Sequence, residues 1–137
     1  MLRFRQISLN LVYFINILLI FLLVFEEKVQ LPLFLQVGGR LHPLVLHFPL
    51  VLLFVGIFLE WLTSRERFRH PATVEITSFI FYLFALGAAI TALFGFFLYR
   101  EGAYQGDAVT WHKWTGLAVS LLGVLIVWLK AAPRVVY

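Results

Sequence analysis

Cysteine is absent from this chain of 137 residues, and its absence excludes several kinds of chemistry. Without thiolates the chain forms no disulfide, ligates no iron–sulfur cluster through cysteine and attaches no c-type haem covalently. The sequence also lacks a serine or threonine in a nucleophile motif and a glycine-rich phosphate loop. Hydrolytic, thiol-dependent and nucleotide-dependent catalysis are therefore disfavoured.

Charge is scarce as well, since 13% of the residues are charged whereas 62% are hydrophobic. The mean hydropathy is +0.94. A soluble domain of this composition would have too little polar material to cover its surface. The net charge of +4 does not indicate nucleic acid as a partner, because the basic residues flank apolar runs, as in membrane proteins. We therefore expect a lipid bilayer around most of the chain.

Four runs are long enough to cross the hydrocarbon core, which requires roughly 20 apolar residues. The sequence predicts an all-α membrane protein, a bundle of four transmembrane helices formed by a single domain, residues 1–137. The first run is followed by charged residues rather than by a small-residue cleavage site, which favours a retained anchor. The predicted helices are residues 7–25, 43–62, 74–99 and 111–130, with a linker at 26–42, a cytoplasmic loop at 63–73 and an outer loop at 100–110.

The distribution of basic residues predicts the orientation of the chain in the membrane. Four spans place both termini on one side, and the loop 63–73 lies on that side too. We expect this side to be the cytoplasm because it holds more basic residues. It carries seven of them, Arg3, Arg5, Arg65, Arg67, Arg69, Lys130 and Arg134, against four on the outer side, Lys28, Arg40, Arg100 and Lys113.

This topology gathers three of the four histidines, His42, His47 and His112, at the outer side and leaves His70 on the other. His47 lies about 7 Å deeper than His42 at ~1.5 Å per residue and is turned about 140° around the helix. These two histidines therefore cannot bind one metal from a single helical face. The preferred pair of ligands is His47 with His112, from two helices, and His42 with His112 is the second choice.

An imidazole within the apolar layer needs partners for its ring nitrogens, and haem iron is such a partner. Small residues, including the stripe Gly87, Thr91 and Gly95, favour close approach of a helix or of a flat cofactor. We expect aromatic rings to pack on the cofactor and basic side chains to pair with its propionates. The aromatic candidates are Phe48, Trp111 and Trp114, and the basic ones are Arg40, Arg100 and Lys113.

Structural roles remain open for the same residues. His42 could cap its helix, His112 could belong to an ordinary interfacial belt with Trp111 and Trp114, and the small-residue stripe could serve helix packing alone. His70 is expected to be a solvated loop residue. The acidic residues of the outer side could form a divalent metal site with the histidines, but no tight ligand spacing supports one.

Two motifs resemble a bacterial family of predicted membrane proteins, domain of unknown function 2231. The first runs from Gly39 through Arg40, His42 and His47 to Pro49 as G-R-L-H-P-L-V-L-H-F-P, and the second starts at His112 as H-K-W-T-G. The resemblance covers residues 38–130. Members of this family are often joined to, or encoded near, c-type cytochromes, which implies redox work in the membrane. This chain carries no cytochrome part of its own, so it would serve a cytochrome as a separate subunit.

The leading hypothesis is a b-type haem-binding subunit of the bacterial inner membrane. It would transfer electrons between a quinone or membrane enzyme and an extracytoplasmic cytochrome c, with other membrane subunits as partners. His47 and His112 would be the axial ligands, and His42 an alternative ligand or a neighbour of one. The alternative is a cofactor-free subunit that anchors a larger membrane complex. A transporter is disfavoured because the four helices show no repeats and no buried acid pairs.

Overall fold

The computed structural model describes residues 2–102 and 105–131 of the chain. Among these residues, four helices are long and apolar enough to cross a membrane, which confirms the predicted all-α bundle. The structure consists of α1 (Leu2–Val24), α2 (Leu33–Gly39), α3 (His42–Thr63), the 3-10 helix η1 (Glu66–Phe68), α4 (Pro71–Arg100) and α5 (Asp107–Ala131).

The helices begin earlier than hydrophobicity alone predicts. Pro71 occupies the start of α4, where a missing N–H costs little, and Asp107 opens α5 with a charge that suits the helix dipole. The short helix α2 lies in the segment predicted to be a linker. Residues 103–104 of the predicted outer loop, together with Arg134, lie outside the described residues.

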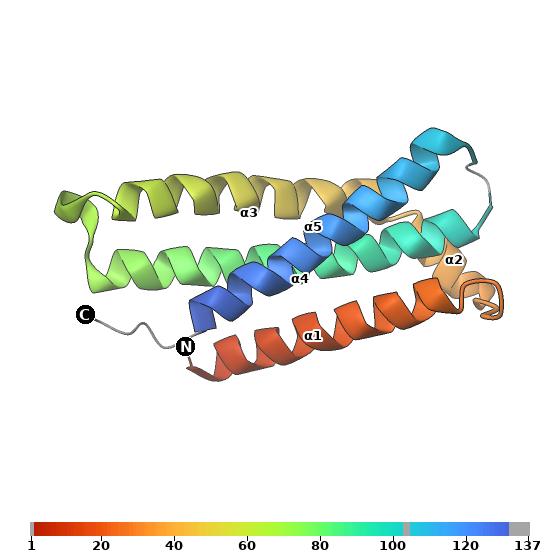
Figure 1. Ribbon diagram of the computed structural model, residues 1–137, viewed down its shortest axis with the longest axis horizontal. Helices are drawn as coiled ribbons and strands as arrows, with labels where there is room; N and C mark the ends of the chain where they lie inside the picture. The colour runs from red at the N-terminus through yellow and green to blue at the C-terminus, as the bar shows by residue number, and fades with distance from the viewer. Residues whose placement is uncertain (1, 103–104, 132–137) are drawn as a thin grey trace.

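Helix α4 is the centre of the bundle and packs against α1, α2, α3 and α5 (Figure 1). The start of α1, the end of α5 and the turn between α3 and α4 lie toward one end of the molecule. The starts of α3 and α5 lie toward the other end, with α2 and the end of α4, and we call this the histidine end. The predicted cytoplasmic side of the chain corresponds to the opposite end, and the orientation in the membrane stays a prediction.

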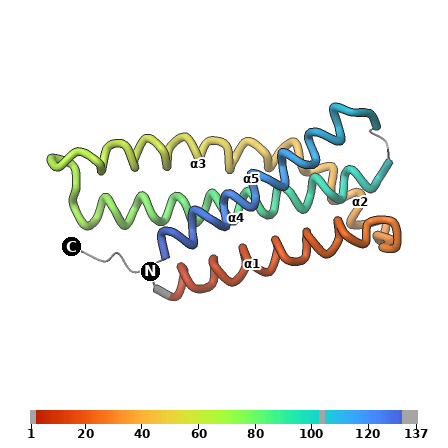
Figure 2. The backbone as a smooth tube through the Cα atoms, in the orientation of Figure 1, coloured from red at the N-terminus to blue at the C-terminus, as the bar shows by residue number. Residues whose placement is uncertain are grey.

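Helix α5 crosses the bundle obliquely (Figure 2). Its last part lies beside the start of α1, where Arg5 donates to the Lys130 carbonyl at 3.2 Å. Toward the histidine end it diverges from α1. At the crossing point Gly123 lies so close to α4 that a Cβ atom there would meet the Ala85 Cα at 3.1 Å.

A hydrogen bond between buried polar side chains joins α1 to α5. Ser120 donates to the Asn16 Oδ1 at 2.8 Å, and the Asn16 amide donates to the Val12 carbonyl at 2.9 Å. Asn16 therefore faces another helix, whereas Asn10 is exposed and bonds Gln6 one turn earlier on α1.

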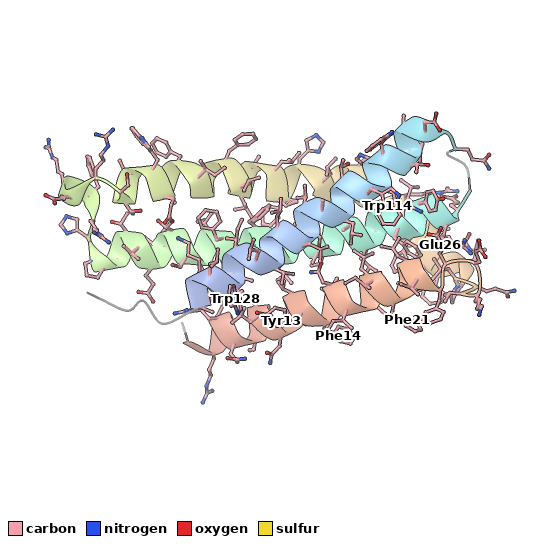
Figure 3. The ribbon with its side chains drawn as sticks, in the orientation of Figure 1. Tyr13, Phe14, Phe21, Glu26, Trp114 and Trp128 are labelled. Atoms are coloured by element: carbon pink, nitrogen blue, oxygen red, sulfur yellow. The ribbon has the colours of Figure 1, made fainter. Side chains whose placement is uncertain are left out.

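The outer surface of the bundle is apolar, as lipid contact requires. On α1, the side chains of Phe14 and Phe21 point away from the other helices (Figure 3), and both are exposed. Helix α3 likewise exposes Leu44, Phe48, Val51, Phe54 and Phe58. Large apolar side chains therefore lie on the surface as well as in the core, where Leu19, Phe84 and Phe96 are buried.

Candidate functional site

Two histidines from different helices meet at the histidine end. His42 is the first residue of α3 and His112 lies in the second turn of α5. Their Nε2 atoms are 3.4 Å apart, and the ring centroids are 5.7 Å apart, with the ring planes at 81°. The centroid separation exceeds the Nε2 separation by about twice the distance from the centre of an imidazole ring to one of its nitrogen atoms. The two Nε2 atoms therefore lie on the line between the ring centres, and each points directly at the other ring.

Helix α4 holds the imidazole of His42 in place. The His42 Nδ1 donates to the main-chain carbonyl of Thr91 at 2.9 Å. One turn further along α4, the ring lies against Gly95, where a Cβ atom would be 2.9 Å from the His42 Cε1. The absence of a side chain at Gly95 is therefore what lets this imidazole approach the helix.

Thr91 makes a second link between α3 and α4. Pro49 lies within α3 and has no N–H to donate, so the carbonyl of Val45 lacks its helical partner. The Thr91 hydroxyl donates to that carbonyl across a long distance of 3.5 Å. Thr91 thus bonds α3 through its hydroxyl, while its carbonyl accepts from His42.

The other histidines lie elsewhere. His47 is on an exposed face of α3, and its Nδ1 donates to the Pro43 carbonyl at 3.0 Å on the same helix. The turn of about 140° between positions five residues apart separates it from His42. The structure thus brings His112 to His42, the second choice from the sequence, and not to the preferred His47. His70 is exposed and directly precedes α4.

A cavity of about 400 Å³ adjoins the two imidazoles. It lies where α5 diverges from α1, and four helices contribute to its wall. The residues with polar side chains in this wall are His42, Tyr99, His112 and Lys113, and the rest of it is apolar. The apolar part includes Leu19 and Leu23 of α1, Ala92, Gly95 and Phe96 of α4, and Gly116 and Leu117 of α5.

The three basic side chains expected near a cofactor each have a partner within the chain. Lys113 contacts the Glu26 carboxylate at 3.2 Å, and Arg100 donates to the Val29 carbonyl at 3.2 Å. Arg40 bonds Glu101, with the Nε at 3.0 Å from Oε1, and this hydrogen bond holds the pKa of the Glu101 carboxyl below its usual range. Of these three basic residues, Lys113 lines the cavity.

The aromatic residues expected to cover a cofactor lie toward the outside. Trp111, Trp114 and Phe48 are all exposed, and none belongs to the cavity wall. Trp114 instead lies near the Lys113 ammonium, with the Nζ atom 5.3 Å from the ring centroid, on the same side of the molecule as Glu26 (Figure 3). The rings of Tyr99 and Phe96 line the cavity in their place.

Sequence reasoning missed the Thr91 carbonyl, because a main-chain acceptor leaves no trace in the residue pattern. It also missed Leu19 and Leu23 as cavity residues, because an apolar side chain on a transmembrane helix gives no indication of whether it faces lipid or a cavity. The stripe of Gly87, Thr91 and Gly95 is the signal for the approach to α4, since it predicts close contact of a helix or cofactor there. At Gly95 the group that approaches is the His42 imidazole.

Comparison with known proteins supplies a family. The sequence model of a family described as "Predicted membrane protein (DUF2231)" matches residues 38–136. The match includes α3, α4 and α5 and therefore both histidines of the pair, whereas α1 precedes it. No curated protein and no solved structure matches the chain.

Proposed function

Because the chain belongs to the DUF2231 family of predicted membrane proteins, whose description names no activity, we propose that it is a haem b-binding electron-transfer subunit. It would exchange electrons between the membrane and a c-type cytochrome on the extracytoplasmic side of the bacterial inner membrane. The observation that carries the proposal is the head-on arrangement of His42 and His112, with Nε2 atoms 3.4 Å apart beside an apolar cavity.

Head-on imidazoles are the arrangement that opposite axial ligands require. Two nitrogen atoms on either side of one metal are about 4 Å apart, since each metal–nitrogen bond is about 2 Å. His42 and His112 are slightly closer than this. His112 is exposed on α5, so its side chain has room to move outward while His42 stays on α4.

The supply of protein ligands also favours haem over a free metal ion. In the described part of the chain, no three His, Asp or Glu side chains gather in a cluster that could hold an ion. A haem brings four nitrogen ligands of its own and needs only two from the protein. His42 and His112 would hold such a haem, and the haem would supply outer-sphere electron transfer.

The size and polarity of the cavity are those of a site for a largely apolar ligand. Its volume of about 400 Å³ falls within the range of about 300–1,000 Å³ for ligand sites. Ala92, Gly95 and Gly116 contribute little side-chain volume to its wall, which leaves space for a flat ring. Lys113 is the cation placed to attract a haem propionate. Its ammonium would then leave the Glu26 carboxylate and pair with the propionate.

The test is an optical spectrum of the purified chain in detergent after haem has been supplied. We expect a reduced-minus-oxidised spectrum of a six-coordinate, low-spin haem. His42→Gln and His112→Gln should each abolish that spectrum, and the matched control His47→Gln should retain it. A colourless wild-type chain with intact helical circular dichroism would refute the proposal, and loss of haem in His47→Gln alone would refute the ligand pair.

The second candidate is a cofactor-free subunit that anchors a membrane complex. One observation favours it: Lys113, Arg40 and Arg100 are already engaged within the chain. In that case the His42–His112 contact would be a hydrogen bond that holds α3 to α5. His42→Gln would then loosen the assembly with its partner subunits and leave electron transfer to cytochrome unchanged in the complexes that still form.

A further inference from the structure

We propose that the turn of α4 from Thr91 to Gly95 is a positioning element that fixes the proton of His42 on Nδ1 and presents its Nε2 as the stronger metal ligand of the pair. This proposal rests on the proposed function for its consequence in haem binding. Its structural part concerns the haem-free chain and can be tested alone.

The argument begins with the proton on His42. A carbonyl oxygen only accepts hydrogen bonds, so the contact of 2.9 Å with Thr91 requires a hydrogen on the His42 Nδ1. In the neutral ring the His42 Nε2 then carries a lone pair. A bond from Nδ1–H to a main-chain carbonyl is a common feature of metal-ligating histidines, where it sets the orientation of the ring and raises the basicity of the ligand.

The proton on His112 follows from that of His42. The two Nε2 atoms face each other at 3.4 Å, and two lone pairs in that position would repel. His112 must therefore carry its hydrogen on Nε2 when both rings are neutral and no metal is bound. The pair is asymmetric: His42 is ready to bind a metal through Nε2, whereas His112 must first release that proton or move it to Nδ1.

Gly95 is the residue on which this arrangement depends. A Cβ atom at position 95 would lie 2.9 Å from the His42 Cε1 and 3.0 Å from Nδ1. These are atoms of a side chain, so the imidazole can move away while the helices stay packed. Gly95→Ala should therefore break the bond to Thr91 and leave the fold intact.

Two control variants separate this effect from a general change in α4. Gly87→Ala lies two turns earlier on the same helix, and its Cβ atom would meet the Phe48 ring at 3.3 Å. Thr91→Val removes the hydroxyl that donates to Val45 but keeps the carbonyl that accepts from His42. Neither change touches the His42 imidazole directly.

The first experiment is nitrogen NMR of histidine-labelled, haem-free chain in detergent. We expect opposite tautomers, Nδ1–H for His42 and Nε2–H for His112, with His42 losing its preference in Gly95→Ala and keeping it in Gly87→Ala and Thr91→Val. A wild-type His42 with its hydrogen on Nε2 would overturn the proposal without any variant.

The second experiment uses the haem-loaded chain. Gly95→Ala should weaken haem binding by about 10–100-fold, the usual effect of losing a partner of a ligand, and should shift the reduction potential upward because His42 then donates less charge. Unchanged affinity and potential would refute the effect on haem. If no variant or wild-type chain binds haem, the proposed function fails, whereas the NMR result still decides whether the Thr91–Gly95 turn positions His42.

Discussion

The two ends of the helix bundle are built from the same four spans, yet they differ in how they fill the space between them. At the opposite end, Lys130 pairs with Glu60 and lies over the Phe81 ring at 5.0 Å, and Arg5 donates to the buried Tyr82 hydroxyl at 3.3 Å. At the histidine end the same α5 leaves a cavity beside two imidazoles.

The difference shows that the cavity does not come from poor packing of α5 in general. Two turns separate Gly116 from Gly123 on this helix. At Gly123 the backbone of α4 is within van der Waals reach, whereas nothing lies within 4 Å of a Cβ atom at Gly116. The angle at which α5 crosses α4 therefore explains both the close contact at Gly123 and the open space at Gly116.

The largest loss of stability should follow from disturbing the contact that holds α2 to the histidine end. A Cβ atom at Gly39 would lie 2.4 Å from the main-chain nitrogen of Leu98, and backbone atoms cannot move aside. We expect Gly39→Ala to destabilise the bundle by about 3 kcal/mol, as a lower thermal unfolding temperature in detergent. The adjacent Gly38→Ala meets nothing within 4 Å and should be neutral; equal effects of the two changes would contradict the contact.

The next prediction compares the two ends along α5 directly. Gly123→Val should cost about 1–3 kcal/mol because it forces bulk against Ala85, whereas Gly116→Val should cost little, since its methyl groups enter the cavity. Thermal unfolding of the two variants measures the difference. Similar destabilisation by both would mean that α5 is packed alike at both positions.

A smaller loss should follow when the hydrogen bond between α1 and α5 is removed. Asn16→Ala leaves the buried Ser120 hydroxyl without its acceptor, at a cost of about 1 kcal/mol for such a bond between membrane helices. Asn10→Ala is the control, because that residue is exposed and bonds only its own helix. A stability of Asn16→Ala equal to that of the control would show that the bond does not hold α1.

The smallest effect is expected in the dependence of stability on acidic pH. Because Arg40 lowers the pKa of Glu101, their ion pair stabilises the fold above the carboxyl's ordinary pKa of about 4.3. This contribution is lost progressively as the pH falls below the ordinary pKa and then through the lowered pKa of Glu101 in the folded chain. We expect acidification from pH 5 to about pH 3 to reduce the unfolding temperature less in Glu101→Gln than in the wild type. An equal reduction in both would exclude a role for the pair.

Much of the fold could be predicted because apolar length alone identifies spans. The four long helices follow from that rule, whereas α2 does not. Its seven residues are too few for a periodic signal, and Gly38 and Gly39 are poor helix formers. The close approach to Leu98 gives Gly39 its role, and that contact is visible only in three dimensions.

The candidate site was only half determined by the sequence. Topology gathered His42, His47 and His112 at one end, but depth in the membrane favoured His47, which satisfies its Nδ1 through the Pro43 carbonyl instead. The pairing of His42 with His112 depends on which face of α3 meets α4. On that face, the missing side chain at Gly95 lets the His42 imidazole reach α4.

The oblique course of α5 also makes it a lever. His112 lies eight residues, or about 12 Å, beyond Ser120, where the helix is bonded to α1. A small tilt of α5 about that point would change the gap between the imidazoles in proportion to this distance. A ligand bound between the two imidazoles would therefore favour one tilt of α5. By thermodynamic reciprocity, a bilayer whose thickness changes the tilt would change the affinity for that ligand.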